Sequence, residues 1–101
     1  MDINKLMQQA QVMQKQIEDA SNAINDMEFE AEASNGLVKV VMNGENKILN
    51  IDIDSSILVP EDKEMIEELI VIAVNNANQK VEEYKKERFG SMASAFGIPM
   101  K

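Results

Sequence analysis

The stretch that decides the fold runs from Glu28 to Asp54 and reads EFEAEASNGLVKVVMNGENKILNIDID. Apolar and polar residues alternate along it with a period of two, which is typical of strands with one buried face. Asn35-Gly36 predicts a two-residue hairpin loop of type I′, because both central residues of that turn need positive φ. With this loop, the apolar residues of the first two strands share one face: Phe29, Ala31, Ala33, Val38, Val40 and Met42.

A second turn is predicted within residues 43–46. Keeping one apolar face then aligns Met42 with Leu49 in a third strand. On the opposite face Lys39 falls between Glu32 and Asp52, a charge ladder of about 0.2–1 kcal/mol per pair. That face also carries apolar residues, which are either scattered surface residues or a patch covered by a second subunit. These candidates for dimer contacts are Leu37, Val41 and Ile48.

A long amphipathic helix precedes the strands. Residues 2–27 contain neither Gly nor Pro, and apolar residues recur from Ile3 to Met27 at alternating spacings of three and four. Such a helix spans roughly 39 Å, whereas a six-residue strand spans only about 20 Å. Two interpretations stay open: the helix lies on its own sheet, or part of it projects and packs against a second copy.

A second helix is predicted from about residue 62 to 88, with an apolar face that runs from Ile66 to Tyr84. Met65, Ile72 and Val74 widen this face and favour deep burial of its first half. The connector before this helix contains Ile57, Leu58 and Val59, which we expect under the edge of the sheet.

Gly90 is expected to end the second helix, and residues 91–101 to form a flexible tail. Residues 1–90 then form one domain. The predicted fold class is α+β: a long N-terminal helix, a three-stranded antiparallel meander and a long C-terminal helix.

Composition bounds the function. The 101 residues include no Cys and no His, which leaves neither disulfides nor the usual general base, and fits a cytoplasmic protein. No apolar run is long enough to span a membrane, and the N-terminus does not have the form of a signal peptide. The net charge of −8 opposes binding to nucleic acid, and only residues 80–101 are net positive.

Catalytic and metal-binding motifs are missing from the sequence. An EF-hand loop that began at Asp52 would need Gly and Glu where this chain has Ile57 and Lys63. There is also no Gly-rich phosphate loop, nucleophile elbow or cluster of metal ligands. We therefore predict no catalysis, cofactor, metal site or small-molecule substrate.

The basic residues near the C-terminus do not form a clean stripe on the second helix. Neighbouring acids such as Glu82 and Glu83 are placed to pair with them. The residues alone thus indicate an interaction protein and leave its partner open.

Several segments together point to a known family: LMQQAQVMQKQIE, GLVKVVMNG, IDIDSSIL, DKEMIEELIVIAVNNANQKVEE and a tail with Gly, Met and Pro. With these segments the chain resembles, over residues 4–100, the YbaB/EbfC family of bacterial nucleoid-associated proteins. The resemblance implies a small homodimer in the cytoplasm, at the nucleoid, with helices projecting like tweezers from a central sheet assembly. It also implies loosely specific or non-specific binding of double-stranded DNA, in nucleoid organisation or gene regulation.

In the family, DNA contacts are attributed to the projecting helical parts. By region, this resemblance makes the following residues candidates for DNA binding: Lys5, Lys15, Lys80, Lys85, Lys86 and Arg88. The alternative function is a protein-binding adaptor whose Met-rich helices grip another protein without direct DNA binding.

Overall fold

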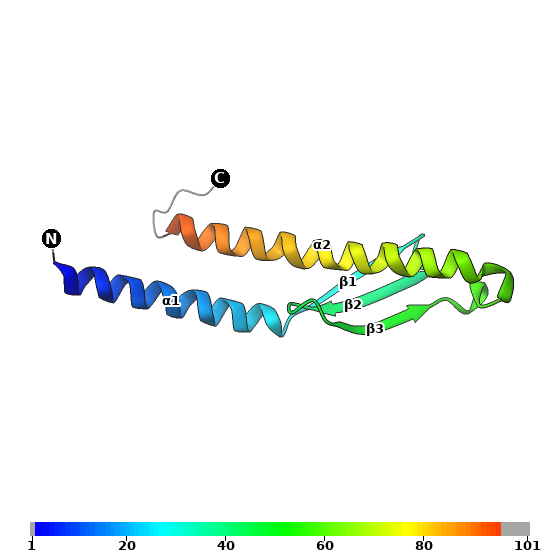
Figure 1. The fold of residues 1–101 in the computed structure, drawn as a ribbon, viewed down its shortest axis with the longest axis horizontal. Coiled ribbons are helices and arrows are strands. Elements are labelled where there is room, and N and C mark those ends of the chain that lie inside the picture. The colour runs from blue at the N-terminus through cyan, green and yellow to red at the C-terminus, as the bar shows by residue number, and fades with distance from the viewer. Residues whose placement is uncertain (1, 96–101) are drawn as a thin grey trace.

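Three antiparallel strands form a sheet in the order β1-β2-β3, and a long helix packs on one face of it (Figure 1). The elements are α1 (Ile3–Asn25), β1 (Glu28–Ala33), β2 (Val38–Asn43), β3 (Ile48–Ile53) and α2 (Lys63–Ala95). Two short 3-10 turns, Ser55–Ile57 and Pro60–Asp62, connect β3 to α2. The computed structural model describes residues 2–95 and measures 70 × 24 × 16 Å. The predicted order of elements and the α+β class are confirmed.

The first hairpin has the predicted register. Ala33 pairs with Val38 and Phe29 with Met42. Asn35 and Gly36 have φ values of +57° and +89°, as a type I′ loop requires. Ser34, just before them, also has a positive φ of +53°, which the sequence did not predict.

The second hairpin departs from the predicted register at its turn. Lys39 pairs with Asp52 as expected, but Met42 pairs with Ile48 and not with Leu49, because the register shifts between Val41 and Met42. The cause lies in Asn43, whose side-chain Oδ1 accepts hydrogen bonds from the backbone N–H groups of residues 45 and 47 at 2.9 and 3.1 Å. This local turn shortens the connection by one residue, so the predicted placement of Ile48 on the face opposite the core is wrong.

Helix α2 covers β1 and β2, and the core lies between them. Its predicted apolar face is confirmed, since Leu69, Ala73, Ala77 and Val81 are all buried. The two alanines let the helix backbone approach the sheet closely, as dense packing requires. At the end of this interface Tyr84 packs edge-on against Phe29, with ring centroids 5.6 Å apart.

Helix α2 continues past Gly90 to Ala95, so the prediction that Gly90 ends it is wrong. A glycine in a helix interior costs only about 0.5–1 kcal/mol relative to Ala, which tertiary packing readily offsets. Here Met92, two residues further on, is buried with only 8% of its surface exposed. The first part of the predicted tail, residues 91–95, is therefore helical, and the rest lies outside the described residues.

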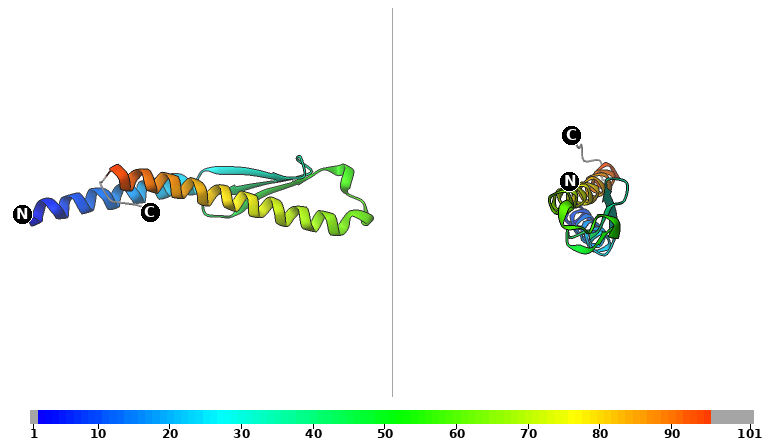
Figure 2. Two further views of the ribbon diagram at one scale, coloured as in Figure 1. Left: turned by 90° about the horizontal axis from the view of Figure 1, so that it is seen from above. Right: turned by 90° about the vertical axis from the view of Figure 1, so that its right-hand side faces the viewer.

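Helix α1 projects from the sheet and does not lie on it (Figures 1 and 2). It runs antiparallel to the C-terminal half of α2 and contacts it sparsely. Only Ala20 and Ile24 of α1 are buried. The apolar residues nearer its tip stay exposed: Ile3, Leu6, Met7, Val12 and Ile17.

Several predicted core residues are instead on the surface. Met65 and Ile72 are 39% and 43% exposed, because they lie to one side of the α2 face that meets the sheet. In the connector Ile57 is buried as expected, but Leu58 and Val59 are exposed.

Candidate nucleic-acid interface

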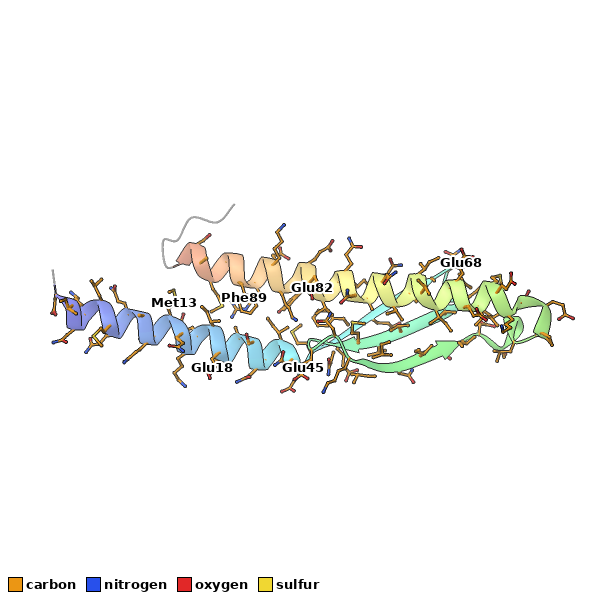
Figure 3. All side chains as sticks on the ribbon, in the orientation of Figure 1. Met13, Glu18, Glu45, Glu68, Glu82 and Phe89 are labelled. Carbon is orange, nitrogen blue, oxygen red and sulfur yellow. The ribbon has the colours of Figure 1, made fainter. Side chains whose placement is uncertain are left out.

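The two helices extend past the sheet as a pair that we call the helical arm, defined as α1 and residues 86–95 of α2. The arm carries four bases and three acids, and Asp2 caps the start of α1, so this end of the molecule is close to neutral although the whole chain has a net charge of −8. Acids gather instead at the opposite end of the molecule, where α2 begins: Glu61, Asp62, Glu64, Glu67 and Glu68. Glu68 points away from the sheet there (Figure 3). The arm is thus less negative than the rest of the described residues and repels a polyanion least.

Four of the six candidate residues lie on the arm. Lys5 and Lys15 are exposed on α1, and Lys86 and Arg88 are exposed on α2. Lys15 forms a 4.0 Å ion pair with Asp19, and both side chains are largely exposed. Such a pair contributes little to stability and leaves the ammonium group accessible to a phosphate.

The other two candidates are held by the body of the protein. Lys80 donates from Nζ to the backbone oxygen of Glu30 at 2.6 Å. The half-buried Lys85 donates to the side-chain oxygen of Asn46 at 3.4 Å. The structure therefore does not bring Lys80 and Lys85 together with the four arm residues.

A shallow groove of about 460 Å³ lies between the two helices of the arm. Its lining from α1 is Gln16, Asp19, Ala20 and Ala23, and its lining from α2 is Arg88, Ser91 and Met92. A base from α2 and an acid from α1 thus line the same groove. Arg88 and Gln16 line this groove but remain exposed, so both stay accessible from the surface of the arm.

The sequence prediction missed the glutamines of α1. Five of them are exposed along the helix: Gln8, Gln9, Gln11, Gln14 and Gln16. A glutamine amide donates hydrogen bonds to phosphate oxygens without adding positive charge. The Gln-rich composition of residues 8–16 was the available signal.

The acidic stretch from Asp52 to Ser56 serves a structural role. Asp54 accepts a 2.8 Å hydrogen bond at Oδ1 from the backbone N–H of Ser56 and caps the 3-10 turn that follows. Hydrogen bonds from the Ser56 side chain and then from its backbone hold the pKa of Asp54 below its ordinary value. Within residues 2–95 no group of three or more acidic, His or Cys side chains is arranged to hold a metal ion. Among the helices described, none is long and apolar enough to cross a membrane.

Comparison with known proteins gives consistent results for sequence and fold. The model of the YbaB/EbfC DNA-binding family matches residues 1–96. A protein of Corynebacterium kroppenstedtii named as a nucleoid-associated protein is 35% identical over 96 residues, which cover 95% of this chain and 96% of that protein. The crystal structure of the uncharacterized protein HP0035 from Helicobacter pylori superposes with a TM-score of 0.78 at 28% identity. That match covers 91% of this chain and 97% of the other.

Proposed function

The chain belongs to the YbaB/EbfC DNA-binding family, and from this premise we propose that it binds double-stranded DNA as a homodimer. Binding is loosely specific or non-specific and serves nucleoid organisation or gene regulation in the cytoplasm. The observation that carries the proposal is the helical arm, where exposed bases and glutamines lie apart from the acidic end of the molecule. Because Lys, Arg and Gln contacts of this kind reach mainly phosphates, they bind duplexes of many sequences.

The two edges of the sheet support a homodimer that forms through β3. The outer edge of β1 is covered by α2, since Asn76 and Lys80 donate to the backbone oxygens of Glu32 and Glu30. Within residues 2–95, no further strand pairs with the outer edge of β3. Strand β3 also has only one charged residue, Asp52, whereas open edges in soluble monomers are usually blunted by charge or proline.

Exposed apolar residues on β3 also support pairing of its outer edge with a second copy of the chain. Ile48, Leu49 and Ile51 are 46%, 51% and 41% exposed, because α2 covers only the other two strands. An antiparallel edge is complementary to itself across a two-fold axis, as an isologous dimer requires. Of the contacts predicted from sequence, Ile48 belongs to this surface, whereas Leu37 packs against its own core and Val41 is half-buried.

Dimerisation raises the affinity for DNA that the net negative charge of the chain lowers. A dimer would carry twice −8, or about −16, so long-range attraction to DNA would be weak. Two arms held by one sheet assembly bind the same duplex at a high effective concentration, which raises affinity without any new kind of contact.

A protein-binding adaptor remains the second candidate, and one observation favours it. The exposed apolar residues of α1 form a row that a partner helix would cover, such as Ile3, Leu6 and Ile17. An adaptor of this kind would not need the arm's bases.

The test is to replace Lys5, Lys86 and Arg88 by Gln and to titrate a labelled duplex. The matched control replaces three bases outside the arm: Lys39, Lys47 and Lys63. Both variants lose the same charge, but the proposal requires a large loss of affinity and a shallower salt dependence in the arm variant alone. Equal losses in both variants would contradict the arm as the site, and absence of DNA binding by the unaltered protein would favour the adaptor.

A further inference from the structure

The turn between β2 and β3, residues 43–47, lies where α1 and α2 meet the sheet. Figure 3 shows Glu45, which belongs to this turn, beside the C-terminal end of α1. Gly44 is buried at this point, and a Cβ atom placed on it would stand 1.9 Å from the backbone oxygen of Ile24. The last turn of α1 therefore rests directly on the backbone of Gly44.

The need for glycine at this position comes from α1 and not from the turn itself. Gly44 is not among the residues with positive φ, so its own backbone conformation would accept an L side chain. The three atoms nearest to an added Cβ all belong to Ile24, and two of them are backbone atoms. A change of rotamer therefore cannot relieve the clash, and α1 and the turn would have to move apart.

The same turn also holds α2. Asn46 donates from Nδ2 to the side-chain oxygen of Asn78, and its Oδ1 accepts from Lys85 Nζ at 3.4 Å. Asn46 has a φ of +64°, a conformation that asparagine tolerates better than most residues. One short turn thus contacts α1 through Gly44 and α2 through Asn46.

We propose that Gly44 and Asn46 are positioning residues, which set the separation of α1 and α2 and so the spacing of the bases on the arm. Few other contacts fix this separation, since α1 buries only Ala20 and Ile24 and contacts α2 sparsely. This inference rests on the proposed function, because spacing matters to DNA only if the bases on both helices contact one duplex.

The geometry gives the size of the effect. To bring the Ile24 oxygen from 1.9 Å to an ordinary contact distance from a Cβ on Gly44, the two must separate by about 1.5 Å, which over one helical turn corresponds to a tilt of roughly 15°. The part of α1 between Ile24 and Ile3 is about 32 Å long, so this tilt moves its tip by roughly 8 Å. That shift is comparable to the spacing between successive phosphates on a DNA strand.

Double electron–electron resonance between two spin labels, one on each helix, measures the separation of α1 and α2 directly. The sequence has no Cys, so Gln9→Cys on α1 and Ser94→Cys on α2 give two unique attachment sites, and both positions are exposed on the helical arm. Mixing labelled with excess unlabelled protein isolates distances within one chain. The comparison is between Gly44→Ala and the matched control Gly90→Ala, where an added Cβ meets nothing within 4 Å.

The inference predicts a shift or broadening of several ångströms in Gly44→Ala and no change in Gly90→Ala. An unchanged distance in Gly44→Ala would overturn it. If Gly44→Ala does not fold, Asn46→Gly keeps the backbone conformation and removes the side-chain bonds to Asn78 and Lys85. The expected result is then a broader distance distribution, and an unchanged one would overturn the inference.

DNA binding by the same proteins separates this inference from the proposed function. Gly44→Ala is expected to bind duplex DNA several-fold more weakly than the unaltered protein. The distance measurement needs no DNA, so it can fail while the proposed function stands. Conversely, absence of DNA binding by the unaltered protein refutes the proposed function and leaves the distance result valid.

Discussion

Replacing Ile51 by Asp is expected to dissociate the dimer and leave the protomer folded. Fully burying an aliphatic side chain contributes about 1.5–3 kcal/mol. Ile48, Leu49 and Ile51 are 46%, 51% and 41% exposed, so covering what remains would contribute together about 2–4 kcal/mol per protomer. An aspartate in place of Ile51 would put two carboxylates at a two-fold interface, which removes the isoleucine's share and adds the cost of desolvating charge.

Light scattering coupled to size-exclusion chromatography at micromolar concentration measures the outcome. The unaltered protein is expected to have twice the mass of one chain, and Ile51→Asp the mass of a single chain. The matched control is Val71→Asp, since Val71 is 58% exposed on α2, away from the sheet, and should leave the dimer intact. Far-UV circular dichroism checks that both variants keep their helices. A monomeric unaltered protein, or a dimeric Ile51→Asp, would refute the assignment of the interface to β3.

Three further outcomes test the fold. Val81→Ala empties space at a side chain with 0% exposure and should lower the free energy of unfolding by about 1–3 kcal/mol, as the urea midpoint would show. Gly90→Ala should raise the thermal midpoint, because an added Cβ meets nothing and Ala favours a helix interior by about 0.5–1 kcal/mol. Hydrogen bonds that Ser56 donates lower the pKa of Asp54. The Asp54 cap therefore stabilises the fold above the ordinary carboxyl pKa, and this stabilisation is lost as pH falls below about 4. Asp54→Asn should therefore flatten the pH dependence of stability in that acidic range, and an unchanged dependence would contradict this role.

Local signals predicted most of the sheet. Asn35-Gly36 fixes the first hairpin because the turn and the alternation require the same register, and both lie within a few residues of each other. The predicted register of the second hairpin was wrong at Ile48. The side chain of Asn43 closes this turn by accepting backbone hydrogen bonds, which the apolar pattern does not encode. The prediction that Gly90 ends α2 was wrong for a different reason. The burial of Met92 outweighs the low helix preference of glycine.

The candidate interface was predictable by region more than by residue. The length of α1 favoured a projecting helix, and α1 does project from the sheet with Lys5 and Lys15 exposed on it. The hydrogen bonds that Lys80 and Lys85 donate were not predictable, because the acceptors in Glu30 and Asn46 lie 50 and 39 residues away in sequence. The role of Gly44 was hidden for the same reason, since its neighbour Ile24 belongs to another element.

The most direct test of DNA binding by the arm is a fluorescence anisotropy titration of a labelled duplex at several salt concentrations. The logarithm of the binding constant should fall with the logarithm of salt concentration, with a slope of about −0.9 per neutralised phosphate. Two arms with four bases each give a predicted slope of roughly −3 to −6, because only the bases that face the duplex make contact. Absence of binding at low salt, where attraction to phosphates is strongest, would contradict the account.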